Sequence, residues 1–250
     1  MKPFADHFSA IAADYAAARP TYPRALFAWL AEVAPARDLA WDCAAGNGQA
    51  AVPLAEFFEQ VIATDASGEQ IGQLPAHPRI RRYAAPAEAS GLEAGTVNLV
   101  TVAQALHWLP LPAFWNEARR VLRASGIIAV WTYGNQRLDH PAIDRQIDAF
   151  YHSVVGPYWP PERRLVETGY RTIEFPFAEL EAPTFDMSLE WPLSAFLAYV
   201  RTWSATNRFV KERGFDPVVE LGRELESLWG AEVRRVSWPL SLRVGRSGSR

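Results

Sequence analysis

Residues 39–67, LAWDCAAGNGQAAVPLAEFFEQVIATDAS, decide the fold. The order is an apolar strand ending at Asp42, a small-residue turn over 44–48, a helical segment, and a second apolar strand ending at Asp65. Glycines in such a turn let a ligand approach the bare backbone, and an acid at the tip of the next strand can accept two hydrogen bonds from a ribose. The stretch therefore predicts a site for a nucleoside-containing cofactor.

The rhythm of strand and helix continues to residue 133. The nearly continuous apolar run 98–103 is typical of a parallel strand covered on both faces. We predict a Rossmann-like, doubly wound α/β sheet of about seven mostly parallel strands, with an antiparallel late strand and helical, aromatic cap insertions. Further strands are expected at 80–84 and 126–133, and further helices at 24–33, 51–58, 68–74 and 112–122.

Beyond Gly134 the pattern becomes irregular and rich in aromatic residues. We expect one domain over 1–250, with a cofactor-binding core at about 38–133. An N-terminal helical lid is expected over 1–34, a substrate cap over 134–230 and a final strand over 231–245. Helices within the cap are predicted at 143–154, 194–207 and 217–229.

Composition limits the partners and the compartment. A net charge of −3 gives no electrostatic reason to expect nucleic acid or an anionic membrane. The single cysteine, Cys43, suits a reducing compartment, and the N-terminus lacks the apolar segment of a secretory signal, so we expect a cytoplasmic location. Arginine pairs such as Arg163-Arg164 are expected on solvated faces or in local salt bridges, and no Cys/His cluster predicts a metal. The oligomeric state, monomer or homodimer, stays open.

The turn itself discriminates between cofactors. A dinucleotide site requires three glycines beneath the pyrophosphate, whereas this turn has only Gly46 and Gly48 after Ala44. The carboxylate of Asp42 would also repel a pyrophosphate. It suits a cofactor with a cationic amino group, and S-adenosylmethionine combines such a group with an adenosine whose ribose would use Asp65.

The motif resembles that of the class I S-adenosylmethionine-dependent methyltransferases. Their acid-x-Gly-x-Gly-x-Gly pattern matches residues 42–48, with Ala44 replacing the first glycine, and we expect an ordinary φ there. The similarity extends over residues 38–133. Within the family the chain most resembles trans-aconitate-methyltransferase-like (type 11) proteins, through Arg19-Pro20-x-Tyr22-Pro23, Gly46-Asn47-Gly48-Gln49, Gln104-Ala105-Leu106-His107-Trp108 and Trp238-Pro239-Leu240.

The resemblance implies a role for each matching position. Asp42 would hold the methionyl amino end, and the backbone at Ala44, Gly46 and Gly48 would run beneath the cofactor. Asp65 would bind both ribose hydroxyls, with Ala66 beside it. The remaining implied contacts are Ala87 and Glu88 at the adenine, Ala103 and Gln104 at the methionyl part, and Tyr15, Arg19 and Tyr22 as an N-terminal lid. Helix caps, a surface charge at Glu88, a core-edge glutamine and a purely structural loop are the alternative interpretations.

The acceptor is a small molecule in this interpretation, with the oxygen of a carboxylate or a hydroxyl as a candidate. His107 is the candidate general base or acceptor-positioning group, and a structural histidine is the alternative. Arg201 or Arg208 could bind an acidic acceptor, although surface positions suit them as well. Candidate pocket walls are Trp108, Trp131, Tyr133, Trp159 and Trp203.

Two other functions remain open. An NAD(P)-dependent oxidoreductase shares the strand–turn–helix unit, but Asp42 and the short glycine set disfavour it. A non-catalytic ligand-binding module could keep the fold, and the retained pair Asp42 and Asp65 speaks against it. Base methylation of nucleic acid is disfavoured because residues 104–107 lack an Asn/Asp-Pro-Pro-aromatic clamp.

Overall fold

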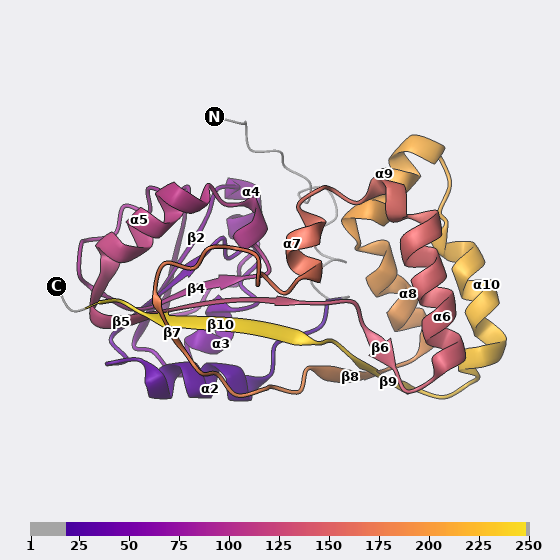
Figure 1. Ribbon diagram of the computed structural model, residues 1–250, viewed down its shortest axis with the longest axis horizontal. Helices are drawn as coiled ribbons and strands as arrows, with labels where there is room; N and C mark the ends of the chain where they lie inside the picture. Colours follow the sequence, from indigo (N-terminus) through magenta and orange to yellow (C-terminus); the bar gives the residue numbers. More distant parts are fainter. Residues whose placement is uncertain (1–18, 249–250) are drawn as a thin grey trace.

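Seven strands form the main sheet of the computed structural model, which describes residues 19–248 (Figure 1). Their order is β3-β2-β1-β4-β5-β10-β7. The first five are mutually parallel, and β10 runs antiparallel to both β5 and β7. This confirms the predicted doubly wound sheet with its antiparallel late strand. The strands are β1 (Leu39–Cys43), β2 (Gln60–Asp65), β3 (Ile80–Ala84), β4 (Val97–Ala103), β5 (Leu122–Tyr133), β7 (Ala178–Leu180) and β10 (Leu240–Arg246).

Alternate residues of the central strands face two separate cores. On β5, Ile127 and Trp131 belong to one apolar cluster, and Ile128 belongs to the other. The first cluster includes the buried face of α2 (Arg24–Val33), and the second includes that of α5 (Leu111–Val121). Because strand side chains alternate with period two, a strand that is apolar throughout requires helices on both faces of its sheet. The short helices α3 (Ala51–Leu54) and α4 (Gly68–Gly72) follow β1 and β2.

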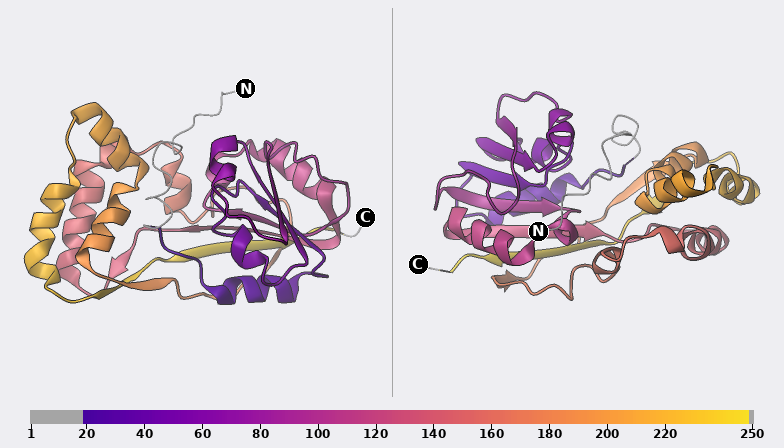
Figure 2. Two further views of the ribbon diagram at one scale, coloured as in Figure 1. Left: turned by 180° about the vertical axis from the view of Figure 1, so that it is seen from behind. Right: turned by 90° about the horizontal axis from the view of Figure 1, so that it is seen from above.

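A helical lobe projects from one end of the sheet (Figures 1 and 2). A three-stranded sheet with the order β6-β9-β8 belongs to it. Between the lobe and the main sheet lies the short helix α7 (Arg163–Glu167). The other elements are β6 (Arg137–Leu138), α6 (Pro141–Ala149), the π-helix η3 (Phe150–Val154), η4 (Gly156–Tyr158), β8 (Ser188–Trp191), α8 (Leu193–Arg201), α9 (Ser204–Arg213), α10 (Val218–Trp229) and β9 (Arg234–Ser237).

Several boundaries in this lobe differ from the sequence prediction. The helix expected over 194–207 is two helices, because the chain turns at Trp203 and packs that ring against Tyr151, Trp159 and Tyr199. The final strand expected over 231–245 is also two strands. Pro239 separates β9 from β10, and the two strands belong to different sheets.

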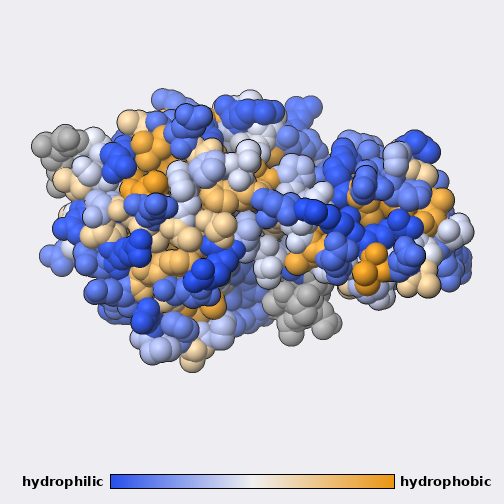
Figure 3. Space-filling model, turned by 90° about the horizontal axis from the view of Figure 1, so that it is seen from below, coloured by the Kyte–Doolittle hydropathy of each residue, from blue (hydrophilic) through white to orange (hydrophobic). Residues whose placement is uncertain are grey.

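The surface is mixed in character. On the face seen in Figure 3, hydrophilic residues interrupt the apolar ones. No helix within residues 19–248 has both the length and the apolar character needed to cross a membrane.

Candidate active site

The turn after β1 has a backbone that few side chains tolerate. Gly46 has φ 54° and Gly48 has φ 92°, both in the left-handed region. A Cβ at Gly48 would lie 2.6 Å from Cγ of the buried Leu74, so glycine is required there by both conformation and space. The expectation of an ordinary φ at Ala44 is wrong, because its φ is 55°. This position therefore adopts the conformation of a glycine at a cost of about 1 kcal/mol.

Asp65 ties this turn to the next strand. One carboxylate oxygen accepts the amide of Gly46 at 2.9 Å, and the other accepts the amide of Ser67 at 2.8 Å. The Ser67 hydroxyl in turn caps α4 by accepting the Gln70 amide at 3.2 Å. Asp65 remains partly exposed, and a carboxylate oxygen has two lone pairs, so both oxygens retain acceptor capacity.

Asp42 lies in a very different environment from Asp65. It is fully buried, and Oδ1 accepts the Thr101 hydroxyl at 2.8 Å. Oδ2 is buried and has no hydrogen-bond partner among residues 19–248. Burial raises the pKa of Asp42 to about 7. The Thr101 hydroxyl and the Ala51 backbone amide oppose this rise, and the nearby charge of Asp65 adds to it. A cationic group near Oδ2 would therefore be stabilised strongly.

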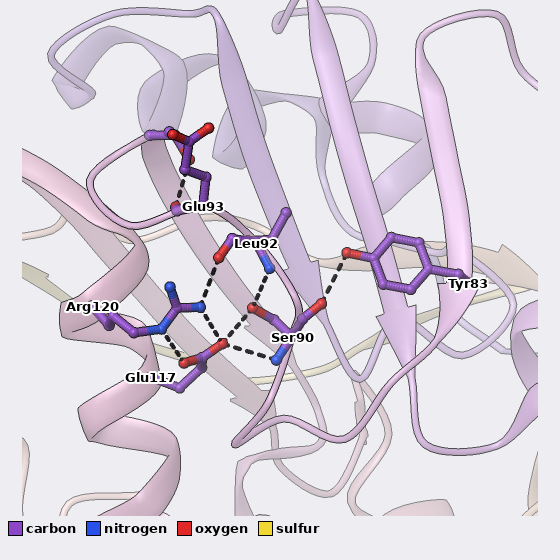
Figure 4. A network of polar contacts seen from close by, with 7 residues as sticks. Tyr83, Ser90, Leu92, Glu93, Glu117 and Arg120 are labelled. Carbon is purple, nitrogen blue, oxygen red and sulfur yellow. Dashed lines mark hydrogen bonds and ion pairs between the residues drawn. The ribbon is translucent and has the colours of Figure 1, made fainter.

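The loop after β3 is held by a buried carboxylate that the sequence did not single out. Glu117, on α5, accepts both the amide and the hydroxyl of Ser90 at 2.8 and 2.5 Å (Figure 4). Arg120 donates to both oxygens of Glu117 and to the carbonyl of Leu92. Tyr83 donates to the Ser90 carbonyl at 2.9 Å. The hydrogen bonds that Arg120 and Ser90 donate to Glu117 lower the pKa of this carboxyl group, despite the opposing effect of burial.

This network fixes the segment that carries the two predicted adenine contacts. Ala87 is buried, whereas Glu88 is exposed. The amide of Ala85 donates to the Asp65 carbonyl at 2.9 Å, so the loop begins directly beside the predicted ribose acid. Because 27 residues separate Ser90 from Glu117, no local pattern signals their contact.

Gln104 follows Ala103 at the end of β4 and has a left-handed backbone, with φ 55°. Its side-chain oxygen accepts the Thr132 hydroxyl at 2.6 Å and the Tyr133 amide at 2.9 Å. The backbone amide of Gln104 donates to the Trp131 carbonyl. The side chain therefore joins the ends of β4 and β5, and the half-buried Ala103 precedes this turn.

The described part of the N-terminal segment packs over the end of β5. Arg19 donates to the Tyr133 hydroxyl at 2.8 Å and to the Thr202 carbonyl at 3.3 Å. Tyr22 is buried and packs edge-on against Trp131, with ring centroids 5.5 Å apart. Burial, chiefly, raises the pKa of Tyr22 and keeps it neutral. Tyr15, the third predicted lid residue, lies outside the described residues.

His107 lies in η2 (Leu106–Trp108), just beyond β4. Its Nδ1 is 2.8 Å from the hydroxyl of the buried Tyr170, which the sequence did not identify. Burial, helped by the charge of Arg163, lowers the pKa of His107 to about 3. The imidazole is therefore neutral at physiological pH. Its low basicity and occupied Nδ1 favour an acceptor-positioning role over that of a general base.

Aromatic rings of the helical lobe gather beside Thr202, whose carbonyl accepts a hydrogen bond from Arg19. Tyr151, Trp159, Tyr199 and Trp203 form one cluster, with ring centroids between 4.9 and 5.8 Å apart. Of the other predicted pocket walls, Trp131 and Tyr133 are buried under the N-terminal segment, and Trp108 is exposed. Arg201 is exposed and paired with Asp216, and Arg208 donates to the Tyr158 carbonyl. No group of three or more His, Cys, Asp or Glu within residues 19–248 is arranged to hold a metal.

The fold and the site define a doubly wound α/β protein whose candidate site lies at the carboxyl ends of its parallel strands, where ligands bind in such sheets. Residues 41–130 match the family model described as a methyltransferase domain. The chain is 33% identical over 226 residues to a Dictyostelium discoideum protein whose name assigns it to the methyltransferases. This match covers 89% of the chain and 86% of that relative. The chain therefore belongs to the methyltransferase family.

Two solved structures extend the comparison. One is a protein of Anaeromyxobacter dehalogenans described as a type II methyltransferase. It is 48% identical with a TM-score of 0.87, and the match covers 93% of this chain and 99% of that one. The other is the cyclase SpnF, which is 15% identical with a TM-score of 0.52 and is covered to 85%, against 93% of this chain. At this identity the likeness is one of fold alone, so the reaction must be argued from the site.

Proposed function

We propose that the protein transfers the methyl group of S-adenosylmethionine to a small-molecule acceptor, with a carboxylate or hydroxyl oxygen as the receiving atom. The observation that carries this proposal is the contrast between two acids at neighbouring strand ends. Asp65 is partly exposed and anchors the turn, whereas Asp42 is buried with one oxygen free of any hydrogen bond among the described residues. A ribose and an ammonium group are the matching ligand parts.

The remaining residues would position the same cofactor. The left-handed backbone at Ala44, Gly46 and Gly48 opens the main chain to a ligand, and Ala66 follows the ribose acid. The loop with Ala87 and Glu88 would flank the adenine, held in place by Glu117. Ala103, Gln104, Arg19, Tyr22 and Tyr15 would surround the methionyl part, with Tyr15 proposed from the sequence alone.

The chemistry supplied by the bound cofactor is a methyl group on a positively charged sulfur. The acceptor oxygen would take the methyl carbon, and the electron pair of the broken carbon–sulfur bond would stay on sulfur in the product S-adenosylhomocysteine. A hydroxyl acceptor also releases a proton, whereas a carboxylate does not. The protein's task is alignment and exclusion of water, for which the aromatic cluster and the neutral His107 are suited.

Thermal unfolding with ligands tests the cofactor. S-adenosylmethionine and S-adenosylhomocysteine should each raise the Tm, because ligands that bind only the folded state stabilise it. NAD should leave the Tm unchanged. Equal shifts, or a shift with NAD alone, would favour the oxidoreductase alternative. Binding of S-adenosylhomocysteine without methyl transfer in a labelled-cofactor screen over small acids, phenols and amines would favour a non-catalytic module.

The proposal also covers partners and location. A small-molecule acceptor, without nucleic acid or a membrane, agrees with the net charge of −3 and with the aromatic cluster of the helical lobe. We assign the protein to the cytoplasm because its single cysteine, Cys43, is a buried free thiol, which suits a reducing compartment.

A further inference from the structure

Arg163 is a half-buried arginine at the junction between the main sheet and the helical lobe. It begins α7, and its guanidinium contacts both sides of the junction. Nε donates to the hydroxyl of Tyr151 in η3 at 2.8 Å, and a terminal nitrogen donates to Oδ1 of Asn135, two residues beyond β5, at 2.7 Å. These two contacts fix the plane and direction of the guanidinium.

No carboxylate within residues 19–248 forms an ion pair with Arg163. Glu167, one turn along α7, accepts a hydrogen bond from the same Tyr151 hydroxyl at 2.6 Å. The hydroxyl therefore lies between the Glu167 carboxylate and the Arg163 guanidinium. In contrast, Arg201 and Arg243 each pair with an acid. A partly buried cation without a counterion is costly, so an anion that reaches it is bound strongly.

Two aromatic rings flank this cation. The guanidinium carbon lies 4.5 Å from the ring centroid of Trp159 and 5.5 Å from that of Tyr151. The indole nitrogen of Trp159 is buried and has no acceptor among the described residues. Gln136, fully buried next to Asn135 in sequence, also has an unpartnered side-chain oxygen. The unused donors belong to Arg163 and Trp159, and they match an oxyanion.

The position of Arg163 relates this cation to the reacting edge of the sheet. Burial is the main cause of the low pKa of His107, which lies beyond β4, and the positive charge of Arg163 lowers that pKa further. The same charge also acts on Tyr199, in α8 of the helical lobe. Helix α7 packs against η2, which carries His107. Arg163 therefore lies between the loop after β4 and the aromatic cluster, where an acceptor must approach the cofactor.

We propose that Arg163 and the indole N–H of Trp159 bind a carboxylate of the methyl acceptor. The acceptor class is then a small organic acid whose apolar part packs on the aromatic cluster, and this inference rests on the proposed methyl transfer. An oxygen paired with a guanidinium is a poor nucleophile, because its charge is already neutralised. The bound carboxylate is thus an anchor, and the methyl group goes to a second oxygen of the same molecule.

Matched acids and amides test this proposal on protein saturated with S-adenosylhomocysteine. The probes are succinate, para-hydroxybenzoate, para-hydroxyphenylacetate and para-coumarate, each compared with its primary amide by calorimetry. At least one acid should bind about 30-fold more tightly than its amide, as expected for a charged hydrogen-bonded pair. Arg163→Gln should weaken that acid about 30-fold and leave the amide unchanged. Arg163→Lys, which keeps the charge but not the planar fork, should be intermediate.

The exposed neighbour Arg164 provides the control, because Arg164→Gln removes an equal charge one residue away and should bind the acid as the wild type does. Equal affinity of every acid and its amide for the wild-type protein would overturn the proposal. So would equal losses in Arg163→Gln and Arg164→Gln. The effect of S-adenosylhomocysteine on the Tm distinguishes a wrong cofactor from a wrong carboxylate anchor. If this ligand fails to raise the Tm of any variant, the proposed function fails. If it stabilises all variants while acids and amides bind alike, only the anchor is wrong.

Discussion

The two sides of the candidate site, which we call its walls, present different chemical groups to a ligand. On the sheet side, the ligand would meet main chain: left-handed turns at Ala44, Gly46 and Gly48, and a loop held by Glu117. On the side of the helical lobe, the ligand would meet side chains, namely the aromatic cluster and Arg163. A main-chain wall tolerates few substitutions, whereas a side-chain wall can be changed ring by ring. Substitutions on the two sides should therefore give different readouts.

The largest expected effect concerns Asp42 and pH. Its native pKa of about 7 lies above the ordinary value of 3.8, so the native state binds the proton more tightly than the unfolded state does. The stabilisation is complete below about pH 4 and is lost as the pH rises to about 7. Asp42→Asn removes this dependence. Between about pH 4.5 and pH 8, the unfolding free energy of the wild type should fall relative to the variant by on the order of 3 kcal/mol. Parallel pH profiles in urea titrations would contradict the assignment.

Gly48→Ala should lower the unfolding free energy by about 2.5 kcal/mol, through the left-handed backbone and the clash with Leu74. Urea titration measures this change. Gly72→Ala is the control, because a Cβ there meets no atom within 4 Å and its φ is not left-handed. A loss as large in Gly72→Ala would show that the turn after β1 has no special geometry.

Asp65→Ala should weaken S-adenosylhomocysteine by about 2 kcal/mol, while the exposed Asp139→Ala leaves it unchanged. A ligand lacking the ribose hydroxyls distinguishes direct contact from loss of the Gly46 anchor. In calorimetry, the deoxy analogue should bind the wild type more weakly than the parent ligand, and the two should bind Asp65→Ala alike. A persisting preference for the hydroxyls in the variant would place the ribose elsewhere.

The smallest effect is expected from Tyr170→Phe, which removes the hydroxyl facing His107 Nδ1. The unfolding free energy should fall by about 1 kcal/mol, with unchanged affinity for S-adenosylhomocysteine, since His107 belongs to the acceptor side. Tyr158→Phe is the matched control, because the hydroxyl of Tyr158 bonds only the exposed Arg213 in the described part of the chain. Loss of affinity for S-adenosylhomocysteine in Tyr170→Phe would contradict the separation of the cofactor side from the acceptor side.

The same contrast explains which features could be predicted from the sequence. The turn at 44–48 and the acids Asp42 and Asp65 are local, because strand, turn and helix follow one another in sequence. Tyr170 and Glu117 were missed because their contacts cross 63 and 27 residues, and nothing in their own neighbourhoods announces a partner. Arg163 was expected on a solvated face or in a local salt bridge. The aromatic run before it, residues 157–161, was the available signal that this arginine stacks on rings instead.

Predictions from local sequence patterns were also wrong where tertiary packing sets the backbone conformation. Trp203 interrupts a helical pattern because its ring is buried in the aromatic cluster. Ala44 adopts a glycine conformation because the turn, closed by the bond from the Ala45 amide to Thr64, demands it. Pro239 was the one readable signal of a broken strand, since proline cannot donate to a ladder.

The alternation of strands between the two sheets has a consequence for folding. Along the chain, β5, β7 and β10 belong to the large sheet, and β6, β8 and β9 belong to the small one. The last strand, β10, is inserted between β5 and β7 and pairs with β5 over seven residue positions. The helical lobe cannot unravel without pulling on strands inside the large sheet. The cofactor side and the acceptor side should therefore melt in a single cooperative transition, although they recognise their ligands by separate means.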